Sequence, residues 1–163
     1  MAGTKIATAN ASVIKVGIAG INSPADKMFE AANFLSGSFT DEATTQETKA
    51  KNSTSAINTV TYHAYKGQGT WQRTSDDPVQ LYLIKLSEGK IGTDCQTKVS
   101  FVGSDGITRT GVFNVSATEL GFSGEADALA TLEIDFTLAS GQPEITYPED
   151  VETALEELQN SEG

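Results

Sequence analysis

The sequence is poor in the residues that most often carry chemistry or cross-links: it has one cysteine, Cys95, and one histidine, His63, in 163 residues. One cysteine excludes an intrachain disulfide and any multi-cysteine metal site. No apolar run approaches the roughly 18 residues that a membrane-spanning helix needs. Residues 1–8 lack the charged start and apolar stretch of a secretory signal. We therefore expect a soluble chain, made in the cytosol, that is held together by packing alone and has no membrane association.

Basic residues are scarce in the second half of the chain. Residues 1–90 carry 9 basic and 8 acidic side chains, whereas residues 91–163 carry 2 basic and 14 acidic ones, which gives the net charge of −11. A surface of this sign repels phosphate backbones. The charge therefore argues against an ordinary nucleic-acid binder.

Threonine and serine are abundant, with 20 and 14 copies. Threonine suits a half-exposed pleated surface, so the composition favours one mainly β domain with large polar faces. The clearest strand covers residues 130–139, where apolar residues alternate with Thr131, Glu133, Asp135 and Thr137. This alternation predicts that Glu133 and Asp135 lie on a polar face of the sheet.

Further strands are expected at residues 12–21, 58–66, 97–103 and 107–116, the last two joined by a turn at Asp105-Gly106. Gly67 and Gly69 are interpreted as a sheet irregularity before a short strand at 70–73. One helix is expected at about 77–88. Ser75 or Asp76 can cap it, and Asp76 and Asp77 lie where the helix dipole favours negative charge. Pro78 suits its first turn, and Gly89 can end it.

Two segments carry little apolar periodicity. Residues 44–56 have too few hydrophobic side chains to form a core, so the region from about 41 to 57 is predicted to be a long exposed loop or a protruding hairpin. Residues 148–163 are acidic. Val151, Ala154, Leu155 and Leu158 in this tail have helical spacing, which allows either a short amphipathic helix or a solvated acidic tail.

A search for catalytic or ligand-binding patterns finds none. A hydrolase needs a base beside its nucleophile, and only His63, in the middle of a predicted strand, could serve. We interpret it as a structural residue. The acidic pair Asp76/Asp77 is explained by helix capping and the pair Glu133/Asp135 by strand alternation, and there is no calcium-loop sequence. No catalytic residue, metal site or cofactor is predicted.

The order of the predicted elements resembles that of the major tail tube proteins of long-tailed, siphovirus-type bacteriophages. The resemblance covers about residues 12–147. It lies in an N-terminal strand, a long polar loop, a glycine-punctuated strand at 59–71, a helix opened by Ser-Asp-Asp-Pro and closed by Ser-Glu-Gly-Lys, a hairpin and the strand at 130–139.

The resemblance implies a β-sandwich or barrel-like tail-tube fold with one flanking α-helix and one β domain over residues 1–147. It implies that six copies form a ring and that stacked rings form a virion tail tube through which DNA passes without specific binding. Tape measure, tail terminator and baseplate proteins are the implied partners, with assembly in the host cytoplasm. It also implies that the protein is not an enzyme. The acidic tail at 148–163 is not explained by it.

In that family the long loop packs on a neighbouring subunit or ring. Independently of the resemblance, a polar strand face outside the core is what a lumen or a subunit joint would use, and a face that is simply solvated is the equal alternative. Glu133 and Asp135 are the residues of that face here. The resemblance assigns the inter-subunit arm to Asp41, Thr44, Thr45, Gln46, Glu47, Lys49, Lys51 and Asn52.

Three alternatives remain open at the level of sequence. The same outline suits a tube protein of a contractile injection or secretion system. A bacterial carbohydrate-binding β-sandwich is a second alternative, against which the single tryptophan and the missing signal peptide weigh. A small hydrolase on a β-scaffold is the third, and its base could only be His63.

Overall fold

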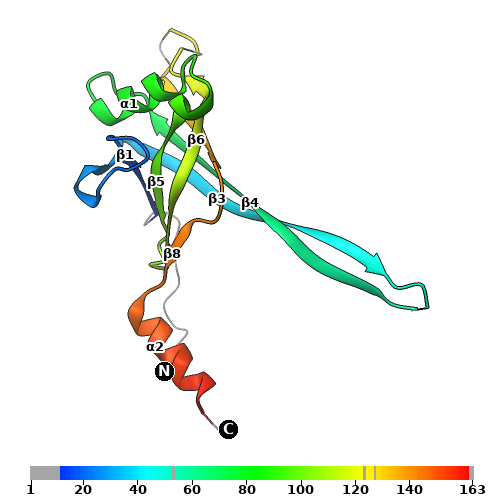
Figure 1. The fold of residues 1–163 in the computed structure, drawn as a ribbon. Coiled ribbons are helices and arrows are strands. Elements are labelled where there is room, and N and C mark those ends of the chain that lie inside the picture. The colour runs from blue at the N-terminus through cyan, green and yellow to red at the C-terminus, as the bar shows by residue number, and fades with distance from the viewer. Residues whose placement is uncertain (1–11, 53, 123, 127, 162–163) are drawn as a thin grey trace.

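The computed structural model describes residues 12–52, 54–122, 124–126 and 128–161. It contains an antiparallel sheet of eight strands in the order β2-β1-β5-β6-β7-β4-β3, with β8 paired to β6 (Figure 1). The elements in chain order are β1 (Val13–Gly17), the 3-10 helix η2 (Ala25–Lys27), β2 (Met28–Glu30), β3 (Phe34–Lys49), β4 (Ala56–Gln72), α1 (Pro78–Ser87), the 3-10 helix η3 (Gly92–Cys95), β5 (Gln96–Val102), β6 (Thr108–Leu120), β7 (Thr131–Leu138), β8 (Glu144–Thr146) and α2 (Glu149–Gln159).

The sheet curls around one hydrophobic core. The ring of Phe39 on β3 lies 4.6 Å from that of Phe101 on β5, and Phe101 lies 5.5 Å from Phe136 on β7, so strands far apart in the sheet order face each other. The expectation of a mainly β, barrel-like fold is thus confirmed. The buried apolar residues of this core are Ile14, Val16, Ala31, Trp71, Val79, Leu83, Val99, Phe101, Phe113, Val115, Leu132, Ile134 and Phe136.

Helix α1 covers one end of the core, and its predicted bounds are confirmed. The N-cap is Asp77 rather than the predicted Ser75 or Asp76, because its carboxylate accepts a hydrogen bond from the Gln80 backbone N–H. Pro78 occupies the first turn, as predicted. Val79 and Leu83 are buried against the sheet. The helix also brings a residue into the core that the sequence did not single out, which is Gln80.

The Gln80 side chain is fully buried and connects three segments. Its amide nitrogen donates to the Ala32 and Gln72 carbonyls at 2.8 and 2.9 Å, and its amide oxygen accepts from the Thr74 backbone N–H at 2.8 Å. A buried polar side chain is stable only when it is hydrogen-bonded in this way. Gln80 therefore fixes the end of β4 and the segment before β3 to α1.

The interpretation of Gly67 and Gly69 as a sheet irregularity is wrong. β4 is one continuous strand, and both glycines pair in regular register with β3 and β7. A Cβ at Gly67 would overlap the Phe101 ring, and one at Gly69 would overlap the Trp71 ring. The two glycines make room for core aromatics, which a sequence pattern cannot reveal because Phe101 is distant in the chain.

The prediction of a long loop is replaced by its alternative, a protruding hairpin. β3 continues to Lys49 and β4 begins at Ala56, so the strands occupy most of the region 41–57. The polar stretch is rich in threonine, which favours extended structure even without a core to bury.

The acidic tail was predicted to be either a short amphipathic helix or a solvated tail, and the structure has the helix. This helix is α2, so the described part of the chain has two α-helices where the resemblance implied one. α2 projects from the end of the domain opposite to α1 (Figure 1). No helix in the described part of the chain is long and apolar enough to cross a membrane.

Candidate assembly surfaces

The outer half of the β3–β4 hairpin, residues 41–63, extends away from the domain and is called the arm below (Figure 1). Its strands remain paired out to Lys49 and Ala56, a length of roughly 25–30 Å. Every described residue of the arm is exposed except Thr44, which is half-buried. All eight residues assigned to an inter-subunit arm lie on it, six in β3 and two, Lys51 and Asn52, in the turn.

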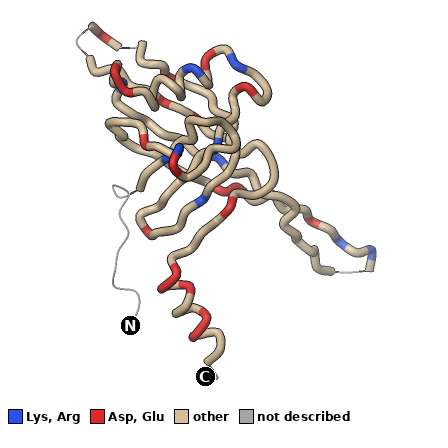
Figure 2. Tube along the Cα trace, turned by 60° about the vertical axis from the view of Figure 1, so that its left-hand side comes forward, with Lys and Arg blue, Asp and Glu red and all other residues tan. Residues whose placement is uncertain are grey.

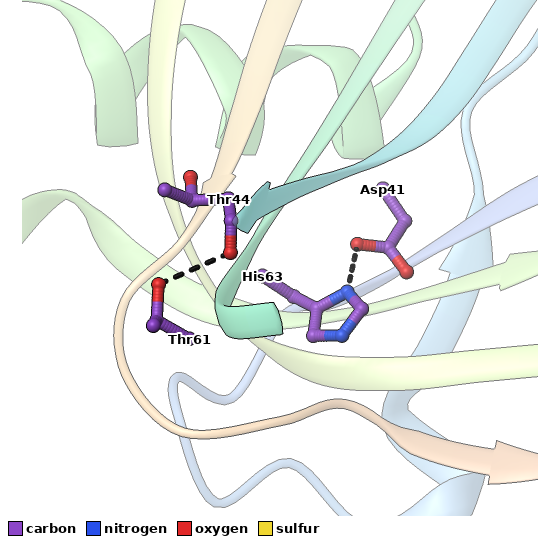
Figure 3. A network of polar contacts seen from close by, with 4 residues as sticks. All are labelled: Asp41, Thr44, Thr61 and His63. Carbon is purple, nitrogen blue, oxygen red and sulfur yellow. Dashed lines mark hydrogen bonds and ion pairs between the residues drawn. The ribbon is translucent and has the colours of Figure 1, made fainter. Parts of the chain in front are cut away.

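A small polar network marks the point where the arm leaves the domain (Figure 3). His63 Nδ1 lies 2.8 Å from Asp41 Oδ1, and the Thr61 hydroxyl donates to the Thr44 carbonyl at 3.1 Å. The His63 ring stacks on that of Tyr65, which is buried in the domain. Because the His63 and Asp41 side chains are more than a third exposed, their pair stabilises the arm only modestly.

A β-bulge at Thr61 changes which side chains share a face of the arm. Thr44 pairs with Tyr62 while the next residue, Thr45, pairs with Val60, so Thr61 is the extra residue. As a result Tyr62 and Ile57 lie on the same face, and Val60 lies on the opposite one. All three are exposed, which gives both faces of the arm apolar surface in contact with solvent.

The outer edge of β3 is a second candidate surface. β3 is the last strand in the sheet order and pairs with β4 alone among the described residues. An edge of 16 residues presents a long row of backbone N–H and C=O groups, which native proteins usually cover or pair with another chain.

The predicted polar face is a third surface. Leu132, Ile134 and Phe136 point into the core with no exposure, and Glu133 and Asp135 lie half-buried on the other side of the sheet, as predicted. Asp135 pairs in register with Ser116 and Gln68. Among the described residues no ion pair neutralises either carboxylate. On β4 the arm ends at His63, five residues from Gln68, which pairs with Asp135. The predicted arm residues and the predicted polar face therefore form separate surfaces.

The hollows of the molecule do not assemble catalytic groups. A groove of about 370 Å³ lies at the seam between β1 and β3, and Arg109 is the one ionisable side chain in its lining. An open hollow beside His63 is lined by Thr61, Tyr62 and Tyr65. His63 and Asp41 resemble the base and orienting acid of a hydrolase. The Thr61 hydroxyl, however, donates to Thr44 rather than to His63.

Metal ligands do not cluster either. Over the residues that the structure describes, no group of three or more histidine, cysteine, aspartate or glutamate side chains could hold a metal ion.

No protein-family model matches the chain, and no curated protein matches its sequence. Its structure, in contrast, is similar to solved structures. A chain from the tail of an empty gene transfer agent (GTA) particle, refined with C6 symmetry, has a TM-score of 0.60 at 12% identity, over 88% of this chain and 99% of that one. A chain of the SPP1 tail tube has a TM-score of 0.59 at 12% identity, over 92% of this chain and 83% of that one. The chain has a tail-tube fold.

A third tail-tube-like neighbour is the tube-terminating cap of the anti-feeding prophage, with a TM-score of 0.57 at 11% identity, over 91% of this chain and 95% of that one. These matches confirm the resemblance inferred from element order at the level of the fold. Sequence reasoning missed the apolar arm residues and the free β3 edge. The sequence does contain a signal for these residues, because Ile57, Val60 and Tyr62 are apolar while the strand that pairs with them is polar.

Proposed function

We propose that the protein is a structural subunit that forms hexameric rings, which stack into a tail tube. The observation that carries this proposal is the match of 88% of the chain to a GTA tail refined with C6 symmetry. The exposed arm and the long β3 edge support it, because both are surfaces that a monomer leaves uncovered. The proposal includes a location in the virion tail after assembly in the host cytoplasm.

The arm is the inter-subunit contact in this proposal. A two-stranded ribbon is at best marginally stable in water, so burial against a neighbouring copy would order it. Lys49 and Lys51 near its tip offer charge to the acidic surface supplied by residues 91–163 of the neighbour. Such exposed pairs give salt-sensitive contacts that are individually weak. Trypsin is expected to cut at these lysines in unassembled protein and to spare them in assembled material.

The polar face with Glu133 and Asp135 lines the lumen in this proposal. A conduit must not bind its cargo, and carboxylates repel a phosphate backbone while water and counterions fill the space between them. DNA would then pass without specific binding. Tape measure, tail terminator and baseplate proteins are the further partners proposed.

The proposal assigns no catalytic activity to the chain and treats residues 1–147 as the tube domain and 148–163 as an appendage. The neighbouring Thr61 hydroxyl donates to the Thr44 carbonyl and not to His63, which supports a structural role for the His63–Asp41 pair.

Electron microscopy of the purified full-length protein in negative stain tests the proposal. We expect rings or tubes whose wall is one subunit thick. The apparent molecular mass from light scattering should rise with protein concentration. Strictly monomeric scattering across a wide range of concentration and salt would contradict it.

A second candidate is a subunit of a contractile injection or secretion system, favoured by the match to the anti-feeding prophage cap. A terminating cap predicts single rings that do not stack. The same micrographs therefore separate a cap from a tube subunit.

A further inference from the structure

Helix α2 presents an apolar stripe that nothing in the described chain covers. Val151, Leu155 and Leu158 follow one another at spacings of four and three residues, which places them on one side of the helix. Their exposed fractions are 61%, 52% and 73%, and every other residue of the helix is also exposed.

A helix of this kind is not stable by itself. It has 11 residues, whereas isolated helices shorter than about 12–15 residues are marginal in water. No side chain caps its N-terminus, and Glu156 and Glu157 lie near its negative C-terminal end. Its stability therefore depends on a partner that covers the stripe and offsets the negative charge.

The helix carries five acidic residues and no basic one. Figure 2 shows this contrast with the arm: α2 carries acidic positions alone, and basic positions lie toward the far end of the arm. Residues 48–62 contain Lys49 and Lys51 and no acidic side chain. The outer part of the arm, residues 48–62, is thus opposite in charge to α2, whereas residues 41–47 of the arm carry Asp41, Glu42 and Glu47. Both projections leave apolar side chains exposed.

The apolar spacings on the two projections also correspond. Because of the bulge at Thr61, Tyr62 and Ile57 share one face of the arm, opposite Thr44 and Thr48 of the partner strand. Four residues of β-strand separate these pairs by roughly 13 Å. The stripe from Val151 to Leu158 spans seven residues of helix, roughly 10 Å.

The arm and α2 project from the domain in different directions in both views (Figures 1 and 2). Pairing between them therefore requires two copies of the chain. We propose that α2 of one copy packs on the Ile57–Tyr62 face of the arm of a second copy, with its acidic side chains near Lys51 in the turn, because Lys49 lies on the opposite face. This proposal rests on the proposed self-assembly and names the surface that receives the arm.

Because each copy has one arm and one α2, the contact is heterologous and can repeat from copy to copy. The acidic partner of the arm tip, given above as the surface of residues 91–163, is thereby narrowed to the acidic residues of α2.

Disulfide cross-linking of mixed single-cysteine proteins tests the contact. In a full-length Cys95→Ser background, one protein carries Thr48→Cys, on the Ile57–Tyr62 face of the arm, and the other carries Ala154→Cys, beside the α2 stripe. The matched control replaces Thr48→Cys by Thr45→Cys, on the opposite face of the arm. Disulfides require Cα atoms within about 7 Å, so the two faces are distinguishable.

We expect oxidation to give a mixed dimer with Thr48→Cys at several times the yield obtained with Thr45→Cys. The yield should fall in about 1 M salt, where the Debye length is about 3 Å. Lys51→Glu should also lower it, and adding Glu152→Lys with Glu156→Lys to the α2 partner should restore it.

Equal yields for the two arm positions, or no mixed dimer while micrographs show rings or tubes, would overturn the α2 contact and leave the proposed function standing. A failure of the proposed function is distinct, because the full-length protein would then show no assembly by scattering or microscopy.

Discussion

The inner and outer halves of the β3–β4 hairpin share one ladder of strand pairs but have opposite surroundings. In the inner half Trp71 is 1% exposed and its ring lies 5.6 Å from that of Phe34. In the outer half Tyr62 is 61% exposed. Strand pairing thus continues beyond the region that packs on a core, and the two functions of a strand, building the domain and presenting a surface, are separated along one hairpin.

The largest expected effect comes from truncating a large side chain of the inner half. Trp71→Ala removes a fully buried ring and should lower the free energy of unfolding by about 3–5 kcal/mol. Tyr62→Ala, in the outer half, should change it by no more than about 0.5 kcal/mol in unassembled protein. Urea unfolding of both variants at low protein concentration measures the difference. Similar losses for the two variants would contradict the division of the hairpin.

The next effect concerns the hydrogen bonds that hold the inner half of the hairpin against α1. Gln80→Leu removes the acceptor of the half-buried Thr74 N–H and the donor to the Ala32 carbonyl, whereas the Gln72 carbonyl keeps the Thr74 hydroxyl at 3.1 Å; each group left unsatisfied and away from water costs about 1–3 kcal/mol. We expect a clear fall in thermal stability. The reciprocal change at the exposed neighbour, Leu81→Gln, should alter stability by less than about 0.5 kcal/mol. A tolerated Gln80→Leu would show that water or rearranged side chains replace these bonds.

The smallest effect is expected at the junction between the two halves. His63→Gln keeps a polar side chain near Asp41 and should change the free energy of unfolding by less than about 1 kcal/mol, because the pair is exposed. Ring or tube formation should be retained. Hydrolysis of an ester or glycoside substrate panel by the unmodified protein, lost in this variant, would overturn the non-catalytic interpretation.

Local signals predicted much of the domain. Pro78 marks the start of α1 to within a residue or two, Asp105-Gly106 marks the β5–β6 turn, and the alternation of residues 130–139 marks β7 and its polar face. These features succeeded because each depends on the backbone preferences of a few adjacent residues.

Features that depend on distant residues were not predictable. The need for glycine at position 67 comes from the Phe101 ring, and the burial of Gln80 comes from three backbone groups outside its helix. The part of β4 from residue 58 onward was predicted as a strand. Residues 41–57 of the arm were predicted as a loop or a hairpin, because hydrophobic periodicity detects packing against a core and this segment has none. Among the candidate site residues, the sequence located the arm and the polar face but not the apolar side chains Ile57 and Tyr62.

The role of the outer half as an assembly surface is tested most directly by deleting Thr45–Ser55. The deletion joins Thr44 to Ala56 and leaves residues 56–61 to close the Thr44–Tyr62 pair, so the core is untouched. The variant is expected to unfold at nearly the same temperature as the full-length protein and to remain monomeric under conditions in which the full-length protein forms tubes in negative stain. Normal tubes from the folded deletion variant would contradict the account.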